Sequence, residues 1–63
     1  MNDTGNSNYV FYCNGVCYER NFDNNVDAEY ISFKFKCWGM KQGFSLFEIE
    51  NLIDEGAAGY YEV

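Results

Sequence analysis

GFSLFEIENLIDEG, residues 43–56, has the sequence of a helix with a marked beginning and a marked end. Ser45 and Glu48 have the spacing of a capping box, in which each side chain accepts a hydrogen bond from the other residue's backbone N–H. Gly56 can adopt the left-handed conformation that commonly ends a helix. We therefore predict a helix that begins after Ser45 and ends before Gly56.

This predicted helix has an apolar side and an acidic side when its residues are placed about 100° apart. Glu50 and Asp54 lie four residues apart beside the apolar stripe, and Phe47 projects among them. Like charges at this spacing weaken a helix by a few tenths of a kcal/mol. Mild local costs of this kind often occur at functional sites. The stripe expected to pack on a sheet consists of Leu46, Ile49, Leu52, Ile53 and Ala57.

We therefore predict that Phe47, Glu50 and Asp54 form a partner-binding surface, with Glu55 beside them. The alternative is that the carboxylates only solvate the helix. In that case Phe47 would be covered by another part of the chain. Glu48 already has a structural role, since it belongs to the cap and places negative charge near the helix N-terminus.

Residues Tyr9–Phe22 have the pattern of a β-hairpin. Asn14-Gly15 is the strongest short-range signal for a two-residue type I′ turn. A three-residue loop would instead exchange the two faces of the second strand. With the two-residue turn, the pairs expected on the core-facing side are Tyr9 with Arg20, Phe11 with Tyr18, and Cys13 with Val16.

Residues Glu29–Trp38 alternate between apolar and more polar side chains, which predicts a half-buried strand. A polar connector, Asp23–Asp27, precedes this segment, and a short loop, Gly39–Gly43, follows it. After the helix, Ala57–Gly59 is expected to be a linker and Tyr60–Val63 an edge strand. The inward-facing residues would be Ile31, Phe33, Phe35 and Cys37, and the outward-facing ones Tyr30, Ser32, Lys34, Lys36 and Trp38.

The predicted fold class is α+β. We expect one domain over residues 9–63, preceded by a disordered tail over residues 1–8. Its small antiparallel sheet would contain the hairpin, a third strand and a short C-terminal edge strand, packed against one helix. Sixty-three residues are too few for a second domain.

The composition is acidic and aromatic, with a formal charge of −6 and 21% aromatic residues. This charge disfavours direct binding to nucleic acid or to anionic membranes, and it suits a partner with a basic surface. The chain shows neither a signal-peptide pattern nor a long apolar span, so we expect a cytoplasmic protein. An odd number of cysteines fits that compartment.

Cys13, Cys17 and Cys37 are the potential metal ligands. A structural zinc site needs four Cys or His ligands, and this chain has three cysteines and no histidine. We therefore expect no metal and no cofactor. The missing histidine also removes the commonest general base, so we expect a protein that is not an enzyme.

The segment GFSLFEIENLID is similar to the GFSLEEI-type helix opening of MerR-family winged-helix regulators. The similarity covers about twelve residues and implies a capped helix opening, without the basic residues of the MerR pattern nearby. In general character, the small acidic chain resembles phage-encoded inhibitors of host machinery such as anti-CRISPR or anti-restriction proteins. That resemblance implies action in the cytoplasm of a host cell.

Three functions follow from these observations, and the first is preferred. The protein would inhibit a nucleic-acid-binding partner by presenting carboxylates where phosphates of the nucleic acid would lie. Alternatively, it is a homo-oligomeric structural or adaptor module whose interface contains Tyr30, Trp38, Tyr60 and Tyr61. The third hypothesis is binding of single-stranded nucleic acid by a lysine–aromatic sheet face made of Tyr30, Lys34, Lys36 and Trp38.

Overall fold

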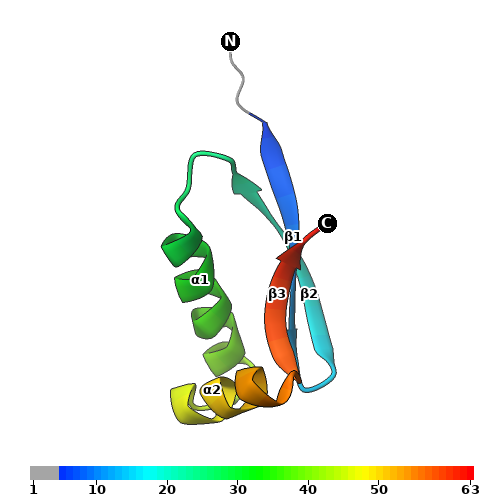
Figure 1. The fold of residues 1–63 in the computed structure, drawn as a ribbon, viewed down its shortest axis with the longest axis vertical. Helices are drawn as coiled ribbons and strands as arrows, with labels where there is room; N and C mark the ends of the chain where they lie inside the picture. Colours follow the sequence, from blue (N-terminus) through cyan, green and yellow to red (C-terminus); the bar gives the residue numbers. More distant parts are fainter. Residues whose placement is uncertain (1–4) are drawn as a thin grey trace.

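The computed structural model describes residues 5–63, which form one antiparallel sheet and two helices. The strand order is β2-β1-β3, so the first strand lies in the middle. Figure 1 shows both helices on one side of the sheet, with α1 along the strands and α2 across one end. The predicted α+β class is confirmed. The elements in chain order are β1 (Asn6–Cys13), β2 (Val16–Asp23), α1 (Ala28–Lys41), α2 (Leu46–Glu55) and β3 (Ala58–Glu62).

The hairpin of β1 and β2 has the predicted two-residue turn. Asn14 and Gly15 both have positive φ, at 50° and 92°, as a type I′ turn requires. Phe11 and Cys13 on the predicted core-facing side are fully buried. The three predicted pairs are confirmed: Tyr9 with Arg20, Phe11 with Tyr18, and Cys13 with Val16.

The C-terminal edge strand is also confirmed, and it begins earlier than predicted. β3 pairs with β1 from Ala58 onward, so the expected linker Ala57–Gly59 belongs largely to the strand. The backbone N–H of Asn14 donates to the carbonyl of Ala57 at 2.9 Å. This bond attaches the hairpin turn to the short connection between α2 and β3.

The predicted strand Glu29–Trp38 is wrong, because these residues lie in helix α1. The same segment has a helical periodicity in addition to the alternation of its apolar residues. Ile31, Phe35 and Trp38 have the i, i+4, i+7 spacing of one helix face, and all three are buried. Tertiary packing selects the helix, since β3 occupies the free edge of β1 and the sheet needs a covering layer.

This correction changes which side chains face the core. Phe33 was expected to point inward, and 60% of its surface is exposed. Trp38 was expected on the outer face, and it is buried. α1 also continues to Lys41, through most of the segment predicted as the loop Gly39–Gly43. Neither helix is long and apolar enough, within the described residues, to cross a membrane.

The boundary of the predicted N-terminal tail also moves. β1 begins at Asn6 and pairs with Asp23 there, so residues 6–8 of the expected tail are strand. Residues 1–4 of that tail lie outside the part of the chain that the structure describes. β1 is therefore longer than the apolar pattern alone predicts.

The core lies between the sheet and the two helices, and Phe11 stands at its centre. The Phe11 ring has its centroid 5.5 Å from that of Phe35 and 5.9 Å from those of Phe22 and Trp38. All five elements contribute to this cluster, so each element buries apolar side chains against the others. Its buried members are Phe11, Cys13, Phe22, Ile31, Phe35, Trp38, Ile49 and Ala58.

The capping box of α2 is present as predicted. The Ser45 hydroxyl accepts from the Glu48 N–H at 3.1 Å, and the Glu48 carboxylate accepts from the Ser45 N–H at 2.8 Å. Gly56 ends the helix in the left-handed conformation, with φ of 81°. Both predicted boundaries of this helix are therefore confirmed.

We expect Ser45→Ala to lower the free energy of unfolding by about 1 kcal/mol, because one N-terminal N–H loses its acceptor. Urea denaturation followed by far-UV circular dichroism measures the change. Glu48→Gln is the matched control, since a glutamine preserves the capping-box hydrogen bond and removes only the charge. A loss in Glu48→Gln without a loss in Ser45→Ala would show that the charge, and not the hydroxyl acceptor, dominates the cap.

Candidate functional site: the outer face of α2

α2 lies at one end of the molecule and has more of its surface in solvent than the predicted stripe implies. Ile49 is fully buried and Leu52 is half-buried. Leu46 and Ile53, which were expected in the core, are 45% and 40% exposed. The helix therefore rests on the core by a narrow contact and leaves most of its circumference uncovered.

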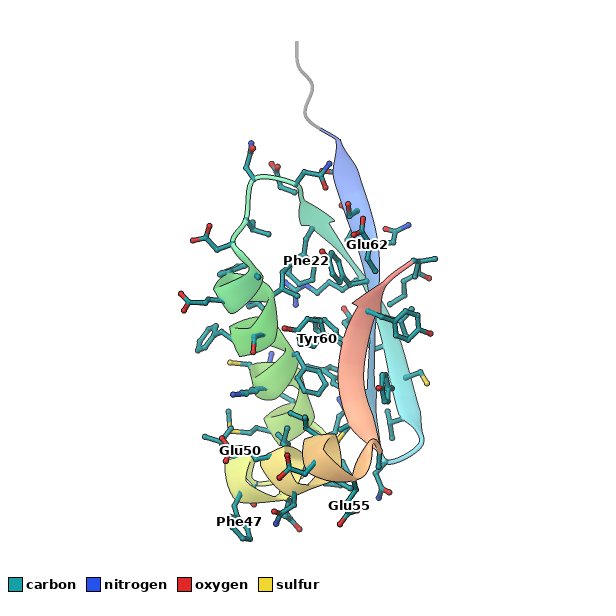
Figure 2. All side chains as sticks on the ribbon, viewed as in Figure 1. Phe22, Phe47, Glu50, Glu55, Tyr60 and Glu62 are labelled. Carbon is teal, nitrogen blue, oxygen red and sulfur yellow. The ribbon has the colours of Figure 1, made fainter. Side chains whose placement is uncertain are left out.

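Phe47 projects away from the body of the protein, as Figure 2 shows. Its exposed fraction is 72%, the largest of any aromatic side chain in the described residues. No part of the described chain covers it, contrary to the alternative considered for the sequence. Glu50 and Asp54 are exposed beside it on successive turns. We define the outer face of α2 as Leu46, Phe47, Glu50, Ile53 and Asp54.

Glu55 occupies a different side of the helix from Glu50. The two are five positions apart in the helix, which places their side chains about 140° apart around the axis. Figure 2 shows the two carboxylates on opposite sides of α2. Glu55 is exposed and adds to the negative field of this end of the molecule. It does not share one contact surface with Phe47 and Glu50.

The four aromatic residues of the predicted secondary interface are not brought together. Trp38 is buried, and Tyr60 packs in the core with its centroid 5.4 Å from that of Phe35. Tyr61 is 54% exposed and lies on the opposite face of the sheet, beside Tyr12. Tyr30 is exposed on the first turns of α1. These four side chains therefore do not form one continuous surface in this fold.

The predicted lysine–aromatic sheet face is also not formed, because its residues lie on a helix. Lys34 lies over the Tyr30 ring, with Nζ 5.9 Å from the ring centroid, at the i, i+4 spacing of α1. Lys36 projects from another side of the helix, and Trp38 is buried in the core. These four residues do not make a flat stacking platform.

The three cysteines are free and separated in the fold. Cys13 is buried on the core-facing side of β1, where burial raises the pKa of its thiol above the ordinary value. Cys17 is exposed on the opposite face of the hairpin, and Cys37 is half-buried on α1. Within residues 5–63, no three Cys, Asp or Glu side chains are grouped to hold a metal ion.

A second site was not predicted from the sequence. A pocket of about 190 Å³ lies between β2 and α1. The sequence prediction placed Lys34 in a strand and Lys41 in a loop, so it kept these two basic residues apart. The signal that would have joined them is their spacing of seven residues, which is two turns of a helix. The pocket is lined by Tyr18, Arg20, Lys34, Cys37, Trp38 and Lys41.

No family model matches the sequence, and no curated protein or solved structure is significantly similar to it. Function is therefore inferred from the exposure, charge and placement of the chain's own side chains. Among the described residues, the outer face of α2 and the basic pocket are two surfaces that folding alone does not explain.

Proposed function

We propose that the protein is a non-enzymatic inhibitor that binds a basic, nucleic-acid-binding protein through the outer face of α2. The observation that supports this proposal is the 72% exposure of Phe47 beside the carboxylates of Glu50 and Asp54. A phenyl ring in water contributes little to folding, whereas the same ring buried at an interface contributes about 1.5–3 kcal/mol. Exposed aromatic residues are enriched at protein interfaces for this reason.

The two kinds of side chain have separate roles in the proposed contact. Glu50 and Asp54 pair with Lys or Arg groups that would otherwise hold phosphates, so the inhibitor and the nucleic acid exclude each other. The net charge of −6 speeds encounter with a positive surface. Phe47 supplies the apolar anchor that the phosphates of nucleic acid lack, which favours the inhibitor at high salt.

α2 presents this face in a fixed orientation. The capping box holds its first turn, Gly56 ends it, and Ile49 is fully buried beneath it. The bond from Asn14 to Ala57 ties its far end to the hairpin turn. Because the helix is already ordered, little conformational entropy is lost when a partner binds, and this raises affinity.

We expect the double variant Glu50→Lys/Asp54→Lys to lose the partner. Wild-type and variant protein would be immobilised and exposed to the fraction of a native-host extract that is retained on heparin. The wild type is expected to capture a protein that double-stranded DNA releases, and the variant is expected to capture at least about tenfold less. Phe47→Ser should also weaken capture while leaving its dependence on salt unchanged.

The matched control is Glu19→Lys/Glu62→Lys on the sheet. Each of these substitutions raises the net charge by two, so both double variants have a net charge of −2 in place of −6. The control should capture the partner nearly as well as the wild type. Equal capture by all three proteins, or loss in both double variants alike, would contradict a specific role for α2.

A further inference from the structure

The pocket between β2 and α1 contains most of the positive charge of this acidic protein. Arg20, Lys34 and Lys41 are three of only four basic residues in the chain, and all three line it. The lining contains no carboxylate. Lys34 and Lys41 are seven residues apart, two turns along one side of α1, and Arg20 faces them from β2.

The nitrogen donors of Arg20 and Lys34 are not used by the contacts that position these two side chains. Arg20 lies over the Phe22 ring, with Cζ 5.3 Å from the centroid, and Lys34 lies over Tyr30. A cation on the face of a ring is held electrostatically and keeps N–H groups free to donate elsewhere. The aromatic residues therefore gather positive charge around the pocket without neutralising it.

We propose that this pocket binds the phosphoryl group of a phosphate monoester. Such a group carries a charge near −2 at neutral pH and three acceptor oxygens. Arg20 can donate two parallel hydrogen bonds to it, and the two lysine ammonium groups can pair with the remaining oxygens. A single carboxylate would match only one of the three positive charges, so the charge balance favours phosphate.

The size of the pocket and its rim restrict the rest of the ligand. At about 190 Å³ it is smaller than the ~300–1,000 Å³ of a site that encloses a whole drug-sized molecule. The organic part of the ester therefore lies at the rim. Tyr18 is 45% exposed there, and one face of its ring stacks on Trp38 with 6.1 Å between centroids. An aromatic ester can stack on the exposed part of Tyr18.

The acidic remainder of the protein does not prevent this binding. At physiological ionic strength, exposed charges separated by more than about 8 Å are largely screened from each other. Carboxylates beyond that distance thus contribute little to the potential at the pocket. The pocket belongs to β2 and α1, so the proposal is independent of the function proposed for α2.

The test is a titration of the full chain at constant ionic strength and about pH 8, where a phosphate monoester is fully dianionic. Phenyl phosphate, inorganic phosphate and benzoate are the probes, and the fluorescence of Trp38, the only tryptophan, is the readout. The fluorescence change caused by phenyl phosphate is expected to saturate. Its dissociation constant should be at least about tenfold lower than that of benzoate. Inorganic phosphate should compete with it. Equal binding of phenyl phosphate and benzoate, or no saturation, would overturn the proposal.

Lys41→Gln and Lys36→Gln make a matched pair, because each removes one positive charge and only Lys41 lines the pocket. Lys41→Gln should weaken phenyl phosphate binding by about tenfold, and Lys36→Gln should leave it within about twofold. Equal weakening would show a general charge effect and contradict the pocket.

The half-buried thiol of Cys37 gives a readout that does not depend on fluorescence. In a Cys17→Ser background, saturating phenyl phosphate should slow alkylation of Cys37 by iodoacetamide. An unchanged rate would place the ligand elsewhere.

Discussion

Phe11→Ala is expected to leave most of the protein unfolded at 25 °C. The side chain is fully buried, and five aromatic rings surround it from β2, β3 and α1. Removing a buried phenyl ring costs about 3–5 kcal/mol. A single core in a domain of this size supplies stability of about the same magnitude. The destabilisation caused by Phe11→Ala is therefore nearly as large as the whole free energy of unfolding.

Far-UV circular dichroism in urea measures this effect. Tyr61→Ala is the control, because it also removes an aromatic ring from the sheet, at a position that is 54% exposed. We expect this control to keep a cooperative transition within about 1 kcal/mol of the wild type. If Phe11→Ala unfolded at the same urea concentration as Tyr61→Ala, Phe11 would not be the centre of the core.

Gly39→Ala is expected to destabilise the protein by about 1–2 kcal/mol, although alanine favours helices more than glycine does. A Cβ at position 39 would lie 2.7 Å from Cδ1 and 3.2 Å from Cγ1 of Ile49. Ile49 is fully buried and cannot turn toward solvent. The overpacking penalty of about 1–3 kcal/mol exceeds the gain in helix propensity of about 1 kcal/mol.

A double-mutant cycle with Ile49→Val tests the cause, because this substitution removes the nearest atom, Cδ1. Gly39→Ala should cost about 1 kcal/mol less in the Ile49→Val background than in the wild type. The free energies come from urea denaturation of all four proteins. If the destabilising effects of Gly39→Ala and Ile49→Val were strictly additive, contact with Ile49 would not be the reason that position 39 rejects a larger side chain.

Two elements could be predicted from the sequence because their signals are local. The turn of the hairpin needs only the positive φ of Asn14 and Gly15. The cap of α2 needs only Ser45 and Glu48, three residues apart. Neither signal depends on what the element packs against, so tertiary structure did not override it.

α1 could not be predicted in the same way, because its sequence satisfies two periodicities. Ile31, Phe33 and Phe35 alternate as a strand requires, while Ile31, Phe35 and Trp38 have helical spacing. The sheet chooses between them: β3 pairs with β1, and a helix must cover the core. Its N-cap is Asp27, but the N3 position holds Tyr30 in place of the Glu or Gln of a capping box, so the start was only weakly marked.

The same distinction holds for the two candidate sites. Phe47, Glu50 and Asp54 belong to one helix, so their common face followed from the helical period alone. The basic pocket joins Arg20 of β2 to Lys41 of α1, and only the packing of those elements brings the two together. A site formed within one element can therefore be predicted from the sequence, whereas a site formed between two elements requires knowledge of how they pack.

The central position of β1 has a consequence for the order of folding. Pairing β1 with β2 requires the closure of a loop of two residues. Pairing β1 with β3 joins Tyr9 to Glu62, about 50 residues apart, and closing that longer loop costs more conformational entropy. We therefore expect β3 to pair late in folding, and α2 to reach its final orientation only then. The unfolded chain carries the same carboxylates without the surface they form. Apparent affinity for the proposed partner, measured through a denaturation series, should consequently fall in step with the fraction of native molecules.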